Sequence, residues 1–277
     1  MYLAPIEASD ARRMKAIAET VDAPFVVHFW DFLDDGIRSD PATRWLIEQA
    51  AAVFVINQAM LDSIAPLRSD AQTLLFTRRP SLFRAAAPSG DTLRILLIGD
   101  IVSYRDGVHR LLEAVTILRE RGCKIAVRYI GRPRVLSVLG LSDGNQIEAV
   151  GFLPSDEARD RAIAECDIGF LPGPMNDPAD DPRSRYSIPS RVLDFMATGL
   201  PFVGTLHRNS AAFRFCSDLG LGEHIACRTV VEVADAIQHL ANDHHWSSRS
   251  TAGLQAFSTM VRSDRYDGLK EVLLQGA

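Results

Sequence analysis

Residues 186–205, which read YSIPSRVLDFMATGLPFVGT, hold the clearest candidates for ligand chemistry in this chain. Pro189 can open a short helix, and Ser190 and Arg191 would then add donors to the free N–H groups of its first turn, a place that attracts phosphate. Asp194, one turn further on, can accept hydrogen bonds from two neighbouring hydroxyl groups, as acidic residues do with ribose. Arg191 and Asp194 equally fit an i,i+3 surface ion pair worth about a few tenths of a kcal/mol, and spacing alone favours that interpretation.

Short apolar runs alternate with amphipathic stretches from residue 93 onward, and these elements must position the candidates. Runs that are apolar throughout are typical of strands buried on both faces of a parallel sheet. The expected strands are LRILLIGD (93–100), KIAVRYIG (124–131), IEAVGF (147–152), DIGFLPG (167–173) and PFVGT (201–205), with a weaker HIACR (224–228). The expected helices span 107–121, 155–166 (capped by Ser155) and 190–198 (ended by Gly199). This alternation predicts a doubly wound α/β fold with right-handed crossovers.

The first 90 residues repeat the pattern in shorter form. Helices are expected over 8–21, over 41–51 and near Met60, each preceding an apolar run: PFVVHFW, AVFVINQ and TLLF. About three strands make a sheet of half the usual size. The Pro-, Ala- and Gly-rich segment 77–92 predicts an interdomain linker. We therefore expect an incomplete Rossmann-like domain over 1–90 with linker 77–92, a complete one over 93–246, and a polar helical tail over 247–277 that packs back across the domains.

Composition excludes several classes of protein. The chain has 277 residues, 47% of them apolar, with 30 Lys plus Arg against 35 Asp plus Glu, and a net charge of −5 argues against a nucleic-acid binder. Apolar runs stay short of the roughly 20 residues of a membrane span, and the first residues lack the apolar stretch of a signal peptide. Four widely spaced cysteines favour free thiols over disulfides or a zinc site. We expect a soluble, cytoplasmic protein.

Familiar nucleotide and hydrolase motifs are absent from the sequence. Gly99 is followed by Asp-Ile-Val, so no GxGxxG fingerprint follows the expected strand, and neither a P-loop nor a GxSxG elbow occurs. The NAD, P-loop and α/β-hydrolase interpretations lose their main support. Asp31, Asp34 and Asp35 lack a His or Glu partner for a metal, and residues 244–246 (HHW) fit a turn between helices better than a ligand cluster.

Residues 93–205 resemble the C-terminal, donor-binding domain of the GT-B-fold glycosyltransferases, specifically the large retaining group that uses nucleotide sugars. PSRVLDFMATGLPFVGT resembles the hallmark PSK-x-x-E-x-m-A-x-G-x-PvV-x-t of that group. VGFLPSDE and CDIGFLPGP resemble two further segments of it, in the same order along the chain. PFVVHFWD and AAVFVINQAMLDSI more weakly resemble late strands of the acceptor domain. The resemblance implies a GT-B-like α/β fold of two Rossmann-like domains, the N-terminal one incomplete.

The resemblance also implies a set of site residues. Asp194 would hold the ribose hydroxyls, the backbone near Phe152 and Leu153 would meet the base, and the Gly99 turn with the helix start near Asp106 would face the diphosphate. Phe152 could equally be a buried core aromatic. The full expected set comprises Asp194 and His28 as catalytic residues and Gly99, Arg105, Arg132, Phe152, Leu153, Tyr186, Ser187, Ile188, Ser190 and Arg191 as substrate-binding residues. No metal or other cofactor is expected.

Several positions depart from the pattern of that group. Asp100 and Asp106 stand where cations usually bind the diphosphate, at a cost on the order of 1 to 4 kcal/mol each, although Arg105 and Arg132 are near enough to substitute. Tyr186 stands at the first acid of the E-x7-E pair. The acceptor-domain histidine aligns best with Trp30, and His28 lies two residues earlier on the same strand face. A large part of the acceptor domain has no counterpart.

Two functions from different classes follow from this pattern. The first is a glycosyltransferase that moves a sugar from a nucleoside-diphosphate sugar to a glycan, lipid or small-molecule acceptor with retention. The second is an inactive or partner-dependent homologue that acts as a binding or scaffold subunit, with a second polypeptide or another copy completing the N-terminal sheet. A third interpretation makes the chain a fragment that lacks upstream residues. The sequence leaves the base, the sugar and the acceptor open.

Overall fold

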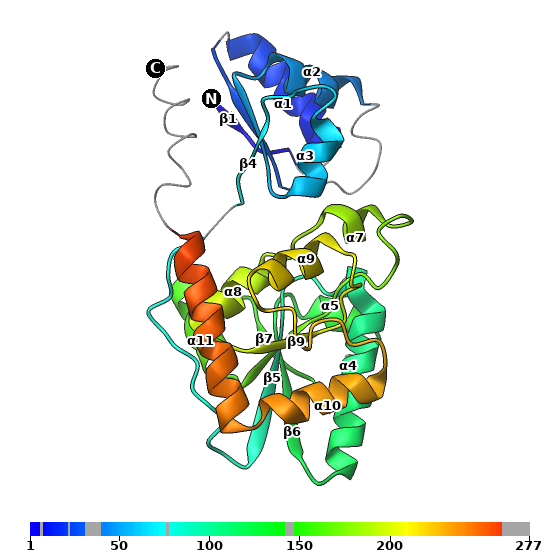
Figure 1. The fold of residues 1–277 in the computed structure, drawn as a ribbon, viewed down its shortest axis with the longest axis vertical. Coiled ribbons are helices and arrows are strands. Elements are labelled where there is room, and N and C mark those ends of the chain that lie inside the picture. Colours follow the sequence, from blue (N-terminus) through cyan, green and yellow to red (C-terminus); the bar gives the residue numbers. More distant parts are fainter. Residues whose placement is uncertain (6–7, 22, 31–39, 76–77, 142–146, 262–277) are drawn as a thin grey trace.

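The computed structural model describes residues 1–277 except 6–7, 22, 31–39, 76–77, 142–146 and 262–277. The described residues form two wholly parallel sheets, one built from the first quarter of the chain and one from residue 92 onward (Figure 1). Helices flank both sheets, so the expected α/β class is confirmed. None of the helices in these described ranges is both long enough and apolar enough to cross a membrane.

The larger sheet has the strand order β7-β6-β5-β8-β9. Its strands are β5 (Thr92–Ile98), β6 (Lys124–Ile130), β7 (Ile147–Gly151), β8 (Ile168–Leu171) and β9 (Phe202–Gly204). The first strand lies in the middle and later strands add to both of its sides, which is the doubly wound arrangement that the sequence predicted. The weak strand expected at 224–228 is reduced to one antiparallel bridge between Thr205 and Ala226.

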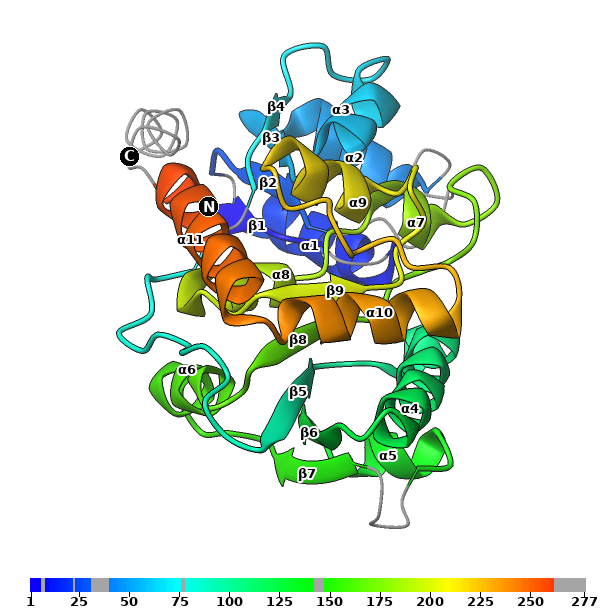
Figure 2. The same cartoon turned by 60° about the horizontal axis from the view of Figure 1, so that its bottom comes forward.

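Helices cover both faces of this sheet (Figure 2). One layer contains α4 (Arg105–Glu120), α5 (Arg134–Val138) and α10 (Val230–Leu240), and the other contains α6 (Asp156–Ala164), α8 (Arg191–Thr198), α9 (Ala211–Asp218) and α11 (Asp243–Met260). Alternate β5 side chains enter opposite layers: Ile95 and Leu97 pack toward α4 and α10, and Leu96 and Ile98 toward α6 and α8. Strand β8 and the second half of β5 are therefore apolar at every position, without alternation.

The helix ends are set by the residues that the sequence singled out. The Ser155 hydroxyl accepts a hydrogen bond from the Ala158 amide at 3.1 Å and caps α6. Gly199 takes a left-handed conformation with φ of 71° and ends α8. Helix α11 packs against α8, so the described part of the expected tail returns to the larger sheet.

The smaller sheet has four strands in the order β1-β2-β3-β4, one more than expected. They are β1 (Tyr2–Leu3), β2 (Val26–Phe29), β3 (Ala52–Val55) and β4 (Gln72–Thr73), and the helices are α1 (Ala8–Val21), α2 (Pro41–Gln49) and α3 (Gln58–Ile64). Strand β1 escaped prediction because two residues carry no readable periodicity. Both edge strands are only two residues long, which limits the backbone available for pairing with another chain.

A segment of the larger domain completes the core of the smaller one. Tyr186, at the end of α7 (Pro182–Tyr186), and Ile188 are buried in the apolar cluster that includes Val27 and Phe29 of β2. The Asn57 side chain donates to the Tyr186 carbonyl at 2.6 Å, and its oxygen accepts from the Met60 amide that starts α3. Residues 186–188 therefore join the two sheets.

Residues 78–91, in the expected linker, contain no helix or strand. They are nevertheless fixed to α8, because the Arg84 guanidinium donates to the Ala197 carbonyl at 2.6 Å and the Ala85 amide to the Thr198 carbonyl at 2.9 Å.

Candidate functional site

The carboxyl ends of β5 to β9 share one edge of the larger sheet, where ligands of α/β proteins usually bind. At this edge β5 turns sharply through Gly99, whose φ of 82° favours glycine. The hydroxyl of the buried Tyr129 donates to the Gly99 carbonyl at 2.8 Å and fixes the turn from below. The turn itself is exposed, so its backbone is accessible to a ligand.

Arg191 lies beneath this turn, at the start of α8. Its Nη2 donates to the Asp100 carbonyl at 2.6 Å, and its guanidinium carbon lies 5.3 Å from the centre of the Tyr104 ring. Its Nη1 is buried and has no hydrogen-bond partner. Burial lowers the pKa of Arg191, against the opposing effect of Tyr104 and Asp100. A buried cation with an unsatisfied donor is suited to bind an anionic ligand.

The surface ion pair that spacing alone favoured for Arg191 and Asp194 is wrong. Both residues are buried, and their side chains bond in different directions. Arg191 reaches the Gly99–Asp100 turn, whereas the Asp194 carboxylate contacts residues of the linker and of α6.

The first turn of α4 closely approaches the ends of β8 and β9. A Cβ atom added at Gly107 would lie 2.6 Å from the Thr205 hydroxyl and 3.2 Å from the Pro172 side chain. The Thr205 hydroxyl is itself buried without a hydrogen-bond partner. The amino end of a 16-residue helix, with its partial positive charge, thus lies at the same edge as Arg191.

The two exposed arginines of the expected set follow two of these strand ends. Arg132 comes directly after Gly131 at the end of β6, and Arg105 opens α4, where its Nη2 lies 3.4 Å from the Val138 carbonyl. The Asp100 carboxylate accepts a hydrogen bond from the Val102 amide at 3.0 Å, just before the short 3₁₀ helix over Val102–Tyr104.

Phe152 follows Gly151 at the end of β7 and is 79% exposed. The alternative that it is a buried core aromatic is therefore wrong. Leu153, the next residue, packs partly into the core beneath α6 and α8. An aromatic ring left open to solvent at the ligand edge of the sheet can stack on a nucleotide base.

Asp194, expected to hold ribose hydroxyls, is already paired. Its Oδ1 accepts from Arg78 at 2.6 Å and lies 3.4 Å from the Arg159 guanidinium. Arg78 also donates to the buried Asp160 of α6. Burial raises the pKa of Asp194, while Arg159 and Arg78 oppose that rise. Sequence reasoning missed Arg78 because it lies 116 residues from Asp194, and only its place in the TRRP run of the linker hinted at a role.

Tyr186, Ser187 and Ile188 form the link between the two sheets. All three are buried, and Tyr186 and Ile188 belong to the core of the smaller sheet. The contacts of Tyr186 and Ile188 serve domain packing, and the substrate-binding role of the three residues stays a prediction. Ser190 is exposed at the amino end of α8, and its hydroxyl makes no capping hydrogen bond.

His28 is enclosed in the smaller sheet. Its Nε2–H donates to the Leu74 carbonyl at 2.7 Å, and its Nδ1 therefore accepts from the Tyr2 hydroxyl at 2.7 Å. Burial lowers the pKa of His28 to about 4, although the Leu74 hydrogen bond opposes this. With both nitrogens engaged and the ring neutral, His28 is held within the smaller sheet, and its expected catalytic role stays a prediction. Trp30 donates to the same Tyr2 hydroxyl over 3.4 Å.

Two further observations bear on the expected set. A groove of about 540 Å³ between the linker and α11 contains none of the expected residues; it is lined by Pro80, Arg84, Thr251, Leu254, Gln255, Phe257, Ser258 and Val261. The three aspartates considered and discounted as metal ligands, Asp31, Asp34 and Asp35, lie outside the described residues.

Comparison with known proteins identifies the family and the fold. A family model described as glycosyl transferases group 1 matches residues 92–243, more than half of the chain. The structure of Anabaena HepE with UDP and glucose matches at a TM-score of 0.64 and 15% identity, over 99% of this chain and 76% of that one. A UDP-forming α,α-trehalose-phosphate synthase from Burkholderia xenovorans matches at 0.67 and 10%, over 99% and 73%. The lipopolysaccharide outer core galactosyltransferase WaaB matches at 0.54 and 11%, over 100% and 75%.

These structural likenesses show a shared GT-B fold, and the expected fold class is confirmed. Together with the family match over the larger domain, they establish that this chain is a member of the group 1 glycosyl transferases.

Proposed function

We propose that this protein transfers a sugar from a nucleoside-diphosphate sugar to an acceptor with retention of the anomeric configuration. The observation that carries the proposal is the buried Arg191 guanidinium beside the exposed Gly99 turn, with Nη1 unsatisfied. Leaving a buried donor without a partner costs about 1–3 kcal/mol, and a diphosphate oxygen at this point removes that cost.

The diphosphate would lie between the Gly99 turn and the amino end of α4. Arg191 would donate from below, and the exposed Arg105 and Arg132 would donate from the rim. The Asp100 carboxylate already accepts from the Val102 amide, which reduces its repulsion of an anion. These groups would stabilise the charge that develops on the leaving diphosphate, which is the main catalytic demand in sugar transfer without a metal.

The nucleoside would extend from the diphosphate toward β7. Phe152 offers its exposed ring to the base, and Asp194 would accept from the ribose hydroxyls while Arg78 and Arg159 hold its carboxylate in place. We propose UDP as the first nucleotide to test, because structures of HepE are described in complex with UDP and with UDP-glucose.

The experiment is a thermal-shift screen of the full chain against UDP, GDP, ADP and their common sugar conjugates. A nucleotide present at about 100 times its dissociation constant should stabilise the fold by about 2.7 kcal/mol, a shift of a few degrees for a chain of this size. Arg191→Gln should reduce the affinity about 10- to 100-fold, as expected for a hydrogen bond to a charged group. Arg44→Gln, which removes an exposed arginine of α2, is the matched control. Equal affinities for the two variants would refute the assignment of Arg191.

Retention is tested separately, by NMR of the product formed from a donor that gives a shift. An inverted anomer would contradict the proposed stereochemistry but would not affect the assignment of the donor site.

A second candidate is a homologue that binds the nucleotide sugar without transferring it. Two observations favour it: Asp194 is held by the linker residue Arg78, and both nitrogens of His28 are engaged in the core. Binding without turnover in the presence of varied acceptors would support this candidate. A partner that completes the smaller sheet would have to pair with the two-residue edges β1 and β4, and light scattering that shows a monomer would count against it.

A further inference from the structure

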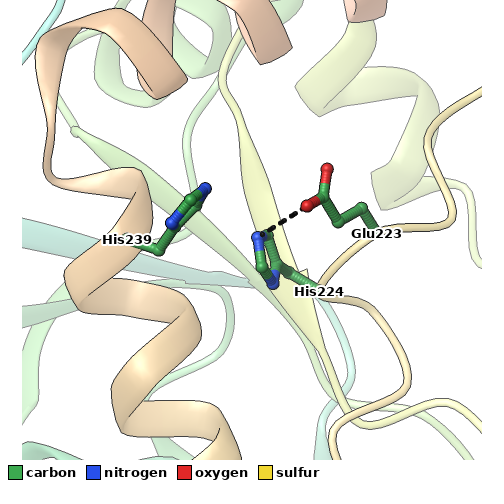
Figure 3. Close-up of side chains that lie close together, drawn as sticks. All are labelled: Glu223, His224 and His239. Atoms are coloured by element: carbon green, nitrogen blue, oxygen red, sulfur yellow. Dashed lines mark ion pairs between the residues drawn. The ribbon is translucent and has the colours of Figure 1, made fainter.

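We propose that Glu223, His224 and His239 form a binding site for one divalent transition-metal ion, with Zn²⁺ as the ion that the donor set suits best. Figure 3 shows the three side chains converging from the loop after α9 and from α10. Their ligand atoms all lie within 4.8 Å of one another. The site is built from elements that contribute no residue to the expected donor site.

The backbone at His224 is held in an unusual conformation. His224 is the one non-glycine residue with positive φ, 63°, among the residues that the structure describes. A left-handed backbone costs roughly 1–2 kcal/mol for a residue with a Cβ, and residues held in such conformations cluster at functional sites. Hydrogen bonds hold this one in place: the Gly204 amide donates to the His224 carbonyl at 2.9 Å, and the Leu206 amide to the Ile225 carbonyl at 2.8 Å.

The Nε2 atom of His224 is buried and has no hydrogen-bond partner. Glu223 Oε1 lies 3.4 Å away, within the range of an ion pair but without the alignment of a hydrogen bond. Burial lowers the pKa of His224, and the neighbouring His239 adds to that effect while Glu223 opposes it. A neutral imidazole with an unsatisfied nitrogen is the form in which histidine binds metals.

The surroundings orient the other two ligands. The Arg249 Nη1 lies 3.5 Å from Glu223 Oε2, so the carboxylate presents Oε1 to His224. His239, in the last turn of α10, has its ring centre 4.8 Å from that of His224 and 3.7 Å from that of His245. Outer contacts of this kind fix ligand orientation in metal sites. The positive charge of Arg249 weakens the site somewhat, but Arg249 is paired with Oε2, the carboxylate oxygen that is not the one close to His224.

The donor set determines the choice of ion. Two imidazole nitrogens and one carboxylate oxygen suit Zn²⁺, whereas Mg²⁺ and Ca²⁺ prefer oxygen alone. Ligand atoms in a tetrahedral zinc site lie about 3.3 Å apart, so modest side-chain rotations would bring these three together, with water or His245 as the fourth ligand. The ion would tie the loop after α9 to α10 and thereby stabilise the larger domain.

The test uses the full chain without an affinity tag, stripped with EDTA and titrated with ZnCl₂ by isothermal calorimetry. We expect one site per chain, and an increase in melting temperature with Zn²⁺ but not with Mg²⁺. Glu223→Gln and His239→Gln should weaken binding about 100-fold or more, since even supporting contacts are worth 10- to 100-fold. His224→Asn keeps a residue that tolerates positive φ and should have the same effect.

His244→Gln is the matched control, because this exposed histidine lies beside the cluster but outside the ligand set. Glu223 is exposed, so Glu223→Gln should fold normally. The test therefore stays decisive even if a histidine variant fails to fold. Unchanged affinity in Glu223→Gln and in either folded histidine variant, or no Zn²⁺ binding by the unaltered chain, would overturn the proposal. With Co²⁺ in place of Zn²⁺, visible absorption typical of four-coordinate cobalt should appear in the unaltered chain and be lost in the ligand variants.

Discussion

The guanidinium of Arg78 donates to the carboxylate of Asp194 over 2.6 Å, and its other Nη donates to Asp160. Asp160 belongs to α6 and Asp194 to α8, whereas Arg78 belongs to the linker between the two sheets. Arg78 thus bridges two buried carboxylates on two helices, and Arg159 supplies a second positive charge near Asp194. This arrangement ties the conformation of the linker to the residue expected to hold the ribose.

Replacing Arg78 should cost more stability than replacing Asp194. Arg78→Gln leaves two buried carboxylates with less compensation, and breaking a buried pair costs about 3–5 kcal/mol. Asp194→Asn removes one charge while Arg78 keeps Asp160, so we expect a smaller loss. Urea unfolding of the two single variants and the double variant measures the coupling energy.

Arg79→Gln is the control for this comparison, because Arg79 is the exposed neighbour of Arg78 in the linker. Equal unfolding free energies for Arg78→Gln and Arg79→Gln would contradict the role of the pair. If Asp194 also binds ribose, Asp194→Asn should weaken nucleotide binding while Arg79→Gln leaves it unchanged.

The larger sheet was predictable from sequence because burial on both faces leaves a local signal. The apolar runs from Leu93 to Gly204 coincide with the observed strands to within a few residues. Helix α6 begins at the Ser155 cap and α8 ends at Gly199, as expected. Such features depend on residues near one another in the chain. Strand β1, with two residues, is too short to produce a period.

The chemistry of the site was less predictable because it depends on contacts between distant residues. The pairing of Arg78 with Asp194, and of His28 with Tyr2 and Leu74, becomes visible only in the folded chain. The interpretation of Tyr186 as substrate-binding followed from its position in a motif, whereas its burial follows from packing between domains. The positions of these side chains follow from tertiary structure, which local sequence patterns do not encode.

Phe152 should contribute to nucleotide binding without contributing to stability. Because its side chain is 79% exposed, Phe152→Ala removes little buried surface. Stacking of a base on an aromatic ring is worth about 1–3 kcal/mol, so nucleotide affinity should fall roughly 5- to 150-fold. Calorimetric titration with UDP and urea unfolding measure the two effects. Leu82→Ala, which truncates a residue 90% exposed in the linker, should change neither, and an unaffected Phe152→Ala would remove Phe152 from the site.

Alanine at Gly107 should destabilise the fold, although alanine in a helix is normally favoured by about 0.5–1 kcal/mol. The new Cβ would lie 2.6 Å from the Thr205 hydroxyl and 3.3 Å from the Pro172 Cα, so α4 must move away from the ends of β8 and β9. Overpacking of this kind costs about 1–3 kcal/mol, and the shift should also weaken nucleotide binding.

Gly253→Ala on α11 should change stability in the opposite direction to Gly107→Ala. Its added Cβ meets only the Met196 Cα, at 3.9 Å, so helix propensity should dominate and stability should rise. Urea unfolding of both variants measures the difference. A stabilising Gly107→Ala would mean that the first turn of α4 can move freely from the strand ends.

The neutral state of His28 should make stability depend on pH. Burial lowers the pKa of His28 from 6.5 to about 4 in the folded protein, so the unfolded chain binds this proton more readily. The contribution of neutral His28 to the free energy of unfolding is therefore fully present above pH 6.5 and is lost as pH falls from 6.5 toward 4. Between pH 7 and pH 5 the loss amounts to about 2 kcal/mol.

His28→Gln tests this assignment, because the glutamine amide can still donate to the Leu74 carbonyl but does not titrate. The variant should be less stable than the unaltered chain at pH 7, and the gap should narrow by about 2 kcal/mol at pH 5. Urea unfolding at both pH values measures this difference. A gap that stays constant would mean that His28 titrates normally, and its enclosure by Tyr2 and Leu74 would then have to open in solution. Sugar transfer that survives in His28→Gln would confirm a structural role for His28.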